Sequence, residues 1–302
     1  MLLVLVVLAA ASRPHVRWAP DAPDPATDPV GAIRTESGVI APILASFDGG
    51  WWVRTPCYRV APVFSATLVQ DVDVVLDPGH GGMEDGAPGV DGIVEKVINI
   101  GVARRVATIL RDNGHHVVLT HQRDDYLTLH TRGEIATSIA PELMVSIHHN
   151  SLGAQPLDRP GTEAIHQIRS ARAKLLAEAL LADVRGAIAQ FDVAWVGTPD
   201  ARANTRRGDD GDYYGILRYS GGVPTAIVEA GYIDNPPEAR LFARSDYQDV
   251  EAAAIAAAIE STLERFHQRD FGDEPQLRPV PGTPAEDAEG CVDPPLEGPA
   301  VS

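Results

Sequence analysis

Three residues of this chain have the types and surroundings expected of a metal site: His80, Glu95 and His148. Two imidazole nitrogens and one carboxylate oxygen suit a zinc ion that keeps one coordination position open for water. We therefore predict one Zn²⁺ per chain on these three residues. Each lies in a motif of its own: Asp77–Gly82, Val94–Lys96 and Ser146–Asn150.

A fourth residue, Glu229, directly follows the apolar run Thr225–Val228. A carboxylate buried at the end of such a strand is costly unless it has a partner. Water at the open position of a metal would be that partner, with Glu229 acting first as general base and then as general acid. The alternative is a buried ion pair between Glu229 and either Arg218 or Arg240.

Each proposed ligand also has a structural alternative. His80 stands among glycines and could be a histidine in a surface turn. Glu95 could be a favourable charge at a helix N-terminus. His148 and His149 point to opposite sides of a strand, so only one of them can face a metal, and the other is then a hydrogen-bonded core residue. Neither an HExxH nor a GxSxG motif is present, which argues against a zincin and a serine hydrolase.

The elements that must position these residues alternate between strands and helices. This order predicts an α/β fold, a mostly parallel twisted sheet flanked by helices, in one domain over residues 72–268. Sites in such sheets lie beyond the carboxyl ends of the strands, where His80, His148 and Glu229 fall. The expected strands are 74–76, 116–120, 143–147, 161–168 and 225–228, and the expected helices 95–113, 129–139, 171–189, 237–242 and 247–266.

The composition narrows the class of protein. The 302 residues are 44% apolar, which is ordinary for a globular protein with a sizeable core. The formal net charge of -17 excludes general nucleic-acid binding and disfavours anionic membranes. Short β-type runs at 38–44 and 51–54, around the hairpin signal Asp48-Gly49-Gly50, predict an N-terminal β-rich extension over residues 31–71.

The two ends of the chain differ from its middle. Residues 1–11 contain an apolar run too short to span a bilayer, and we interpret it as a signal-peptide core whose basic start is missing. We therefore expect an exported protein without stable membrane insertion. Residues 12–30 resemble a linker, and the acidic, proline-rich residues 269–302 predict a disordered tail. Cys57 and Cys291 could be joined in an exported protein, but the tail composition favours unbonded cysteines.

Taken in order, the motifs resemble the zinc-dependent N-acetylmuramoyl-L-alanine amidases of the AmiA/AmiC type, over about residues 72–268. The resemblance implies hydrolysis of the amide between N-acetylmuramic acid and L-alanine in peptidoglycan or a muropeptide. It assigns zinc to His80, Glu95 and His148, rather than His149, and the catalytic carboxylate to Glu229. The motifs that carry it are Val75–Gly82, Gly86-Ala87, Gly89, Gly92, Glu95-Lys96, Leu119-Thr120, Asp124, Leu129, Arg132, Ser146–Asn150, Gly161–Glu163 and Val228–Asn235.

One departure bears on regulation. Some members of this family carry an inhibitory helical insertion after the SIHxN strand. Here about twenty residues separate Asn150 from Ala171, which leaves no room for that insertion. We therefore expect the compact form, an open site and no obligatory protein activator, in the periplasm or cell envelope. A zinc peptidase acting within the stem peptide and an inactive cell-wall-binding module remain alternatives.

Overall fold

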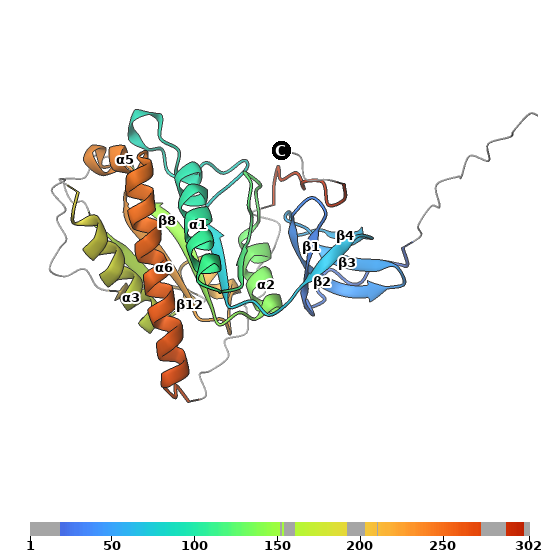
Figure 1. Ribbon diagram of the computed structural model, residues 1–302. Helices are drawn as coiled ribbons and strands as arrows, with labels where there is room; N and C mark the ends of the chain where they lie inside the picture. Colours follow the sequence, from blue (N-terminus) through green and yellow to red (C-terminus); the bar gives the residue numbers. More distant parts are fainter. Residues whose placement is uncertain are drawn as a thin grey trace, which may run out of the picture.

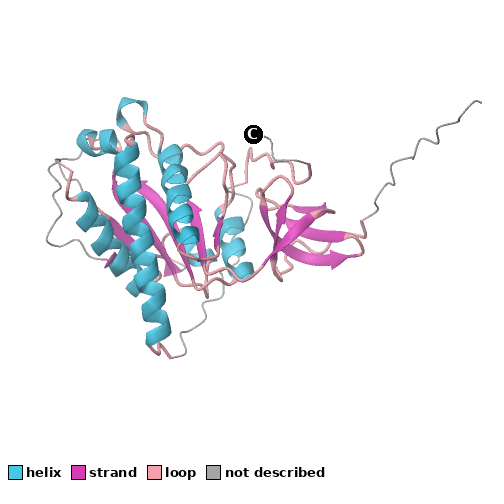
Figure 2. Cartoon of the chain, in the orientation of Figure 1, coloured by secondary structure: helices cyan, strands magenta, loops and turns pink. Residues whose placement is uncertain are grey.

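The computed structural model describes residues 19–151, 153, 161–191, 203–209, 211–272 and 288–298. These residues form two main sheets of different architecture, one flanked by helices and one without (Figures 1 and 2). None of the helices in the described residues has the length and apolar character needed to span a bilayer. The expected signal-peptide core, residues 1–11, lies outside the described residues.

The larger sheet has six strands in the order β10-β9-β13-β8-β6-β7. The neighbouring strands from β13 to β7 are parallel, and β9 runs antiparallel to β13. The predicted mostly parallel α/β sheet is confirmed. Its central strands are apolar runs because helices cover both faces. The six strands are β6 (Val74–Pro78), β7 (Val117–Leu119), β8 (Leu143–Asn150), β9 (Glu163–His166), β10 (Ala203–Asn204) and β13 (Thr225–Tyr232).

Three long helices cover one face of this sheet (Figure 1). Two shorter helices pack on the other face. The first set is α1 (Glu95–Asp112), α3 (Ala171–Ile188) and α6 (Ser245–Gln268). The second set is α2 (Leu129–Ile139) and α4 (Gly215–Tyr219). The remaining helical turns are the 3₁₀ helix Val90–Gly92 and α5 (Pro236–Phe242), which follows β13.

Strand alternation places the chemically interesting residues on the α2 side of the sheet. Val75, Met144 and Ile227 belong to the apolar cluster that contains α2 and α4. Side chains repeat on the same face every second residue, so the same face continues along β6, β8 and β13 to polar residues at their carboxyl ends. Those residues are Asp77, Ser146, His148 and Glu229.

The second sheet is antiparallel, with the order β4-β3-β2-β1-β5. Its own apolar core is small: Ile33, Ala41, Ile43, Val53 and Val63. The hairpin expected at Asp48-Gly49-Gly50 joins β2 to β3. Its strands are β1 (Ala32–Thr35), β2 (Ile40–Phe47), β3 (Gly50–Arg54), β4 (Val60–Val63) and β5 (Ala66–Val69).

The last residue of β3 and the segment that follows it attach this sheet to α2. Arg54 is buried, and its Nε lies 2.9 Å from Oε2 of Glu134 on α2. Tyr58 donates its hydroxyl hydrogen to Oε1 of the same carboxylate at 2.8 Å. The backbone N–H of Thr128, which caps α2, donates to the carbonyl of Pro56 at 3.1 Å. The contact therefore fixes both the start and the middle of α2.

A disulfide joins Cys57 to Cys291, with their Cα atoms 5.7 Å apart. The prediction of unbonded cysteines is therefore wrong. Residues 288–298, here called the C-terminal strap, also pair with the small sheet: Asp293 accepts from the N–H of Cys57 at 2.8 Å, and Glu297 accepts from the N–H of Phe64 at 2.8 Å. The tail composition predicted disorder from its lack of apolar residues, but a covalent link and specific hydrogen bonds hold the strap without a large core.

Candidate metal centre

The turn after β6 presents His80 in a left-handed conformation, with φ of 64°. Such a conformation is uncommon for a residue with a side chain and needs support from its surroundings. Arg132 of α2 supplies it, because its guanidinium donates to the carbonyls of Pro78 and His80, each at 2.7 Å. The position of the His80 ring thus depends on a side chain from a different element.

Asp77 holds Arg132 in place at 2.9 Å, and both side chains are buried. The same carboxylate accepts from Thr120 at 2.7 Å and from Ser146 at 2.8 Å. Burial alone would raise the pKa of Asp77, but the Arg132 charge and the hydrogen bond from Thr120 lower it below its usual value. The carboxylate therefore stays charged and keeps its partner.

Glu95, the first residue of α1, is buried at 3% exposure. Its Oε1 accepts from the side-chain amide of Asn99 at 3.1 Å and from the N–H of His149 at 3.2 Å. Its Oε2 accepts from the N–H of Ala87 at 2.8 Å. These donors fix both oxygens before any ligand binds.

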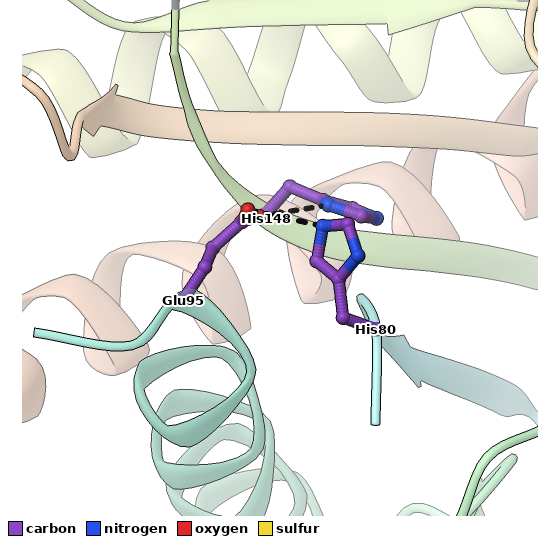
Figure 3. A group of neighbouring side chains, drawn as sticks. All are labelled: His80, Glu95 and His148. Carbon is purple, nitrogen blue, oxygen red and sulfur yellow. Dashed lines mark hydrogen bonds and ion pairs between the residues drawn. The ribbon is translucent and has the colours of Figure 1, made fainter. Parts of the chain in front are cut away.

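The structure brings His80, Glu95 and His148 together (Figure 3). Nε2 of His80 lies 3.0 Å from Oε2 of Glu95, and Nδ1 of His148 lies 3.1 Å from Oε1 of Glu95. One ligand atom from each residue lies within 4.8 Å of the other two. Glycines make room for this group: a Cβ on Gly79 would overlap the His148 ring, and one on Gly86 would lie 2.5 Å from Oε2 of Glu95.

This group of side chains stabilises positive charge. Burial would lower the pKa of His80, but hydrogen bonds to Glu84 and Glu95 raise it to about 9. Burial would raise the pKa of Glu95, yet its contacts with His148 and His80 hold it far below the usual value. A site with a fixed carboxylate and two ring nitrogens fits Zn²⁺ in both charge and donor type.

Glu229 lies beside this group on β13. It pairs in register with His148 of β8 on one side and with Glu163 of β9 on the other. Its side chain is buried, and no described residue donates a hydrogen bond to its Oε2. Burial and the charges of Glu95 and Glu163 raise the pKa of Glu229 well above its usual value. A buried carboxyl of this kind holds a proton more readily than an exposed one, as a group that acts as general acid must.

The alternative ion pairs for Glu229 are wrong. Arg218 donates to the backbone carbonyls of Asp212 and Tyr213, and Arg240 lies 3.3 Å from Asp91. Neither arginine pairs with Glu229, and among the described residues its buried Oε2 has no hydrogen-bond donor.

Comparison with known proteins gives the family. The model of the Amidase_3 family, described as N-acetylmuramoyl-L-alanine amidase, matches residues 74–261. The chain belongs to this amidase family. It is 30% identical over 227 residues to N-acetylmuramoyl-L-alanine amidase AmiA of Escherichia coli, covering 65% of this chain and 77% of that protein.

Solved amidase structures share the fold. The amidase AmiC2 of Nostoc punctiforme superimposes with a TM-score of 0.55 at 33% identity, over 65% of this chain and 98% of that one. The catalytic domain of CwlV from Bacillus (Paenibacillus) polymyxa var. colistinus gives 0.54 at 29% identity, over 64% and 98%. The family match, residues 74–261, contains the six-stranded sheet, whereas the five-stranded sheet lies before it.

The structure also shows the contacts of two residues next to the proposed ligands, His149 and Lys96. His149 points away from the cluster, with Nδ1 2.8 Å from Oδ1 of Asn99 and Nε2 3.3 Å from Glu251, as alternation predicts. Lys96, next to Glu95, instead pairs with Asp85 at 2.8 Å and with Asp124 at 3.0 Å. It ties the glycine-rich loop to the start of α1.

Sequence reasoning gave no role to several residues that shape the site. Asn99 could have been found, because it lies four residues after Glu95 and so on the same helix face. Arg132 was part of the family motif, but only the structure shows its contacts with the His80 turn. Glu163 and Arg206 pair at 3.0 Å across 43 residues, a contact that no spacing rule predicts.

Proposed function

We propose that this chain hydrolyses the amide between the lactyl group of N-acetylmuramic acid and the L-alanine of the stem peptide in peptidoglycan. His80, Glu95 and His148 would hold one zinc ion, and Glu229 would be the general base and acid. The observation that carries the proposal is the buried Glu229, without a hydrogen-bond donor to its Oε2 among the described residues, beside the His–Glu–His cluster of an amidase-family chain.

A zinc ion on these ligands would polarise the amide carbonyl and bring the pKa of water to about 7. Glu229 takes a proton from the attacking water as the new carbon–oxygen bond forms. It then gives that proton to the alanine nitrogen as the carbon–nitrogen bond breaks. The products are a lactyl carboxylate on the sugar and a stem peptide with a free amino end.

The surrounding residues act by positioning. Asn99 and the N–H groups of Ala87 and His149 keep the Glu95 carboxylate from rotating. Arg132 keeps the His80 turn in its left-handed conformation. Preorganised groups of this kind need little rearrangement during the reaction.

We further propose that the enzyme acts outside the cytoplasm. The Cys57–Cys291 disulfide supports this, because disulfides persist in oxidising compartments. Peptidoglycan, the proposed substrate, also lies outside the cytoplasm. An open site that works without an activator stays a prediction, since residues 152 and 154–160, on which it depends, lie outside the described residues.

Digestion of purified peptidoglycan by the zinc-loaded full chain tests the proposal. Mass spectrometry of the released material should show intact stem peptides that begin with a free L-alanine amine. Shortened stem peptides would instead indicate a zinc peptidase. Wall binding without any release would indicate an inactive binding module. Glu229→Gln is the matched control, because it keeps the size of the side chain and removes its acid–base function.

A further inference from the structure

Arg206 lies at the rim of the amidase site, between β10 and β11 (Arg207–Gly208). Its Nη2 donates to Oε2 of Glu163 at 3.0 Å, and its guanidinium carbon lies 5.5 Å from the centre of the Tyr214 ring. The same oxygen of Glu163 accepts from the side-chain amide of Asn150 at 2.9 Å. Asn150 ends β8, two residues after His148.

The sheet register places this arginine close to the reacting groups. Glu163 is the register partner of Glu229, and Glu229 is the register partner of His148. Partners in register share a face, with Cβ atoms about 5 Å apart. Glu163 therefore lies one strand beyond Glu229, on the side away from His148, and Arg206, which follows the next strand β10, reaches back to bind it.

The ion pair between Arg206 and Glu163 contributes little to the stability of the fold. Their side chains are 43% and 25% exposed, and ion pairs at such exposure contribute little to folding. A guanidinium has five N–H groups in a planar fork, and the bond to Glu163 uses one of them. The free edge of that fork suits a second carboxylate, which it can bind through two parallel hydrogen bonds.

Two other cations near the site, both among the described residues, already have acidic partners. Arg132 is buried against Asp77 and the His80 turn. Lys96 pairs with Asp85 and Asp124. In a chain of net charge -17, a half-exposed guanidinium beside the catalytic carboxylate provides local attraction for an anionic group of the substrate.

We propose that Arg206 binds a free carboxylate of the stem peptide, on the residue that follows L-alanine. The inference rests on the proposed amidase function. That residue is a glutamate joined through its γ-carboxyl group, so its α-carboxylate is free unless it is amidated. It lies one residue from the scissile nitrogen, roughly 4–7 Å away, which matches the strand spacing of about 4.8 Å between Glu229 and the strand that carries Glu163.

Two substrates that differ in one group test the proposal: N-acetylmuramoyl-L-alanyl-D-glutamate and its D-isoglutamine counterpart, in which a carboxamide replaces the α-carboxylate. The zinc-loaded wild-type chain should cleave the carboxylate form with a kcat/KM about tenfold higher or more, as expected for a lost charge-assisted hydrogen bond. Arg206→Gln should bring the ratio close to one, because kcat/KM should fall more for the carboxylate form than for the amide form. Arg206→Lys should keep part of the preference.

Arg207→Gln is the matched control, because Arg207 is the exposed neighbour and should leave the ratio unchanged. A wild-type ratio of one, or a wild-type ratio retained by Arg206→Gln, overturns the inference and leaves the amidase proposal intact. An equal loss on both substrates in Arg206→Gln means that the residue is only structural, and also overturns it. Failure of the wild-type chain on both substrates overturns the proposed function, and this inference with it.

Discussion

The two sheets of this protein are stabilised in different ways. The six-stranded sheet is covered on both faces by helices, and its strands end in the polar residues of the site. The five-stranded sheet lies outside the amidase-family match, has a small core, and relies on a disulfide and on the C-terminal strap. In the first region apolar burial leaves strand ends available for chemistry. In the second region, the disulfide and the hydrogen bonds of the strap provide stability that a larger apolar core would otherwise provide.

Helix α2 contacts both regions. Glu134 and Thr128 bind the segment after β3, and Arg132 binds the turn that carries His80. The small sheet therefore supports the element that positions one of the proposed zinc ligands. Changes in each region should still separate, because the chemistry depends on the strand ends of the large sheet, whereas the strap binds the small sheet.

The largest expected effect is on catalysis rather than on folding, and it lies in the catalytic region, here residues 74–261 of the amidase-family match. Glu229→Gln should lower hydrolysis of peptidoglycan by roughly a hundred- to ten-thousand-fold, because it removes the acid–base group. It should keep zinc and the free energy of unfolding, whereas His148→Ala should lose near-stoichiometric zinc. Metal analysis and a digestion assay on the same samples check both. Full activity in Glu229→Gln would remove this residue from the mechanism.

Breaking the link between α2 and the His80 turn should cost stability in the catalytic region. Arg132→Met leaves Asp77 charged and buried, which should lower the free energy of unfolding by about 3–5 kcal/mol. The double change Asp77→Asn with Arg132→Met should cost less than Arg132→Met alone, because no charge is then left unpaired. Urea denaturation measures both.

The matched control for that experiment is Arg240→Met, since Arg240 is exposed and pairs with Asp91 at the surface. It should change stability by no more than about 0.5 kcal/mol. A similar small change in Arg132→Met would show that the His80 turn holds its conformation without this arginine.

The strap should affect stability without affecting chemistry. Replacing Cys57 and Cys291 by serine should lower the free energy of unfolding by about 2–4 kcal/mol, because the link closes a long loop in the unfolded chain. Zinc content and kcat/KM should stay at wild-type values. Denaturation with and without reductant checks this, and the serine variant should not respond to the reductant. An equal response would place the effect of the reductant elsewhere.

The smallest expected effect is a pH slope in the catalytic region. Burial raises the pKa of Glu238 from 4.5 to about 8, although its carboxylate accepts from the N–H groups of Tyr232 and Gly161 at 3.2 Å each. A raised pKa means that the folded state holds its proton more tightly. This contribution to stability is complete below about pH 4.5 and is lost as the pH rises through 8.

Glu238→Gln should therefore flatten the fall in stability between pH 5 and 8, by about 1.4 kcal/mol per pH unit at most. The measurement is the slope of the free energy of unfolding against pH, which is insensitive to a constant cost of the substitution. An unchanged slope would assign the fall to other groups. The pH slope reports a loss of stability in the catalytic region at high pH, and the reductant experiment reports a loss of stability in the small sheet. The two measurements together distinguish these effects.

Much of the catalytic region was predictable because its signals are local. Helix α2 has the expected bounds, Leu129–Ile139, and the ligands follow apolar runs whose carboxyl ends must meet at one edge of a parallel sheet. The antiparallel direction of β9 was not predicted, since an apolar run does not show its own direction. The disulfide was missed because the tail was judged by its few apolar residues. That composition indicates how much apolar surface a segment can bury, but it does not indicate whether a cysteine in it is bonded. The pair of Arg206 with Glu163 depends on how separate elements meet in space.

The disulfide also changes how the molecule bears load. Cys57 and Cys291 are 234 residues apart in sequence, and the whole catalytic region lies between them. A pulling force applied between the outer ends of the chain passes directly through the sulfur–sulfur bond, so residues 58–290 carry none of that tension while the bond is intact. Forced unfolding of the proposed metal site along this axis would require reduction of the disulfide first. A protein attached by one terminus, and pulled through the other, would keep its catalytic sheet unstretched.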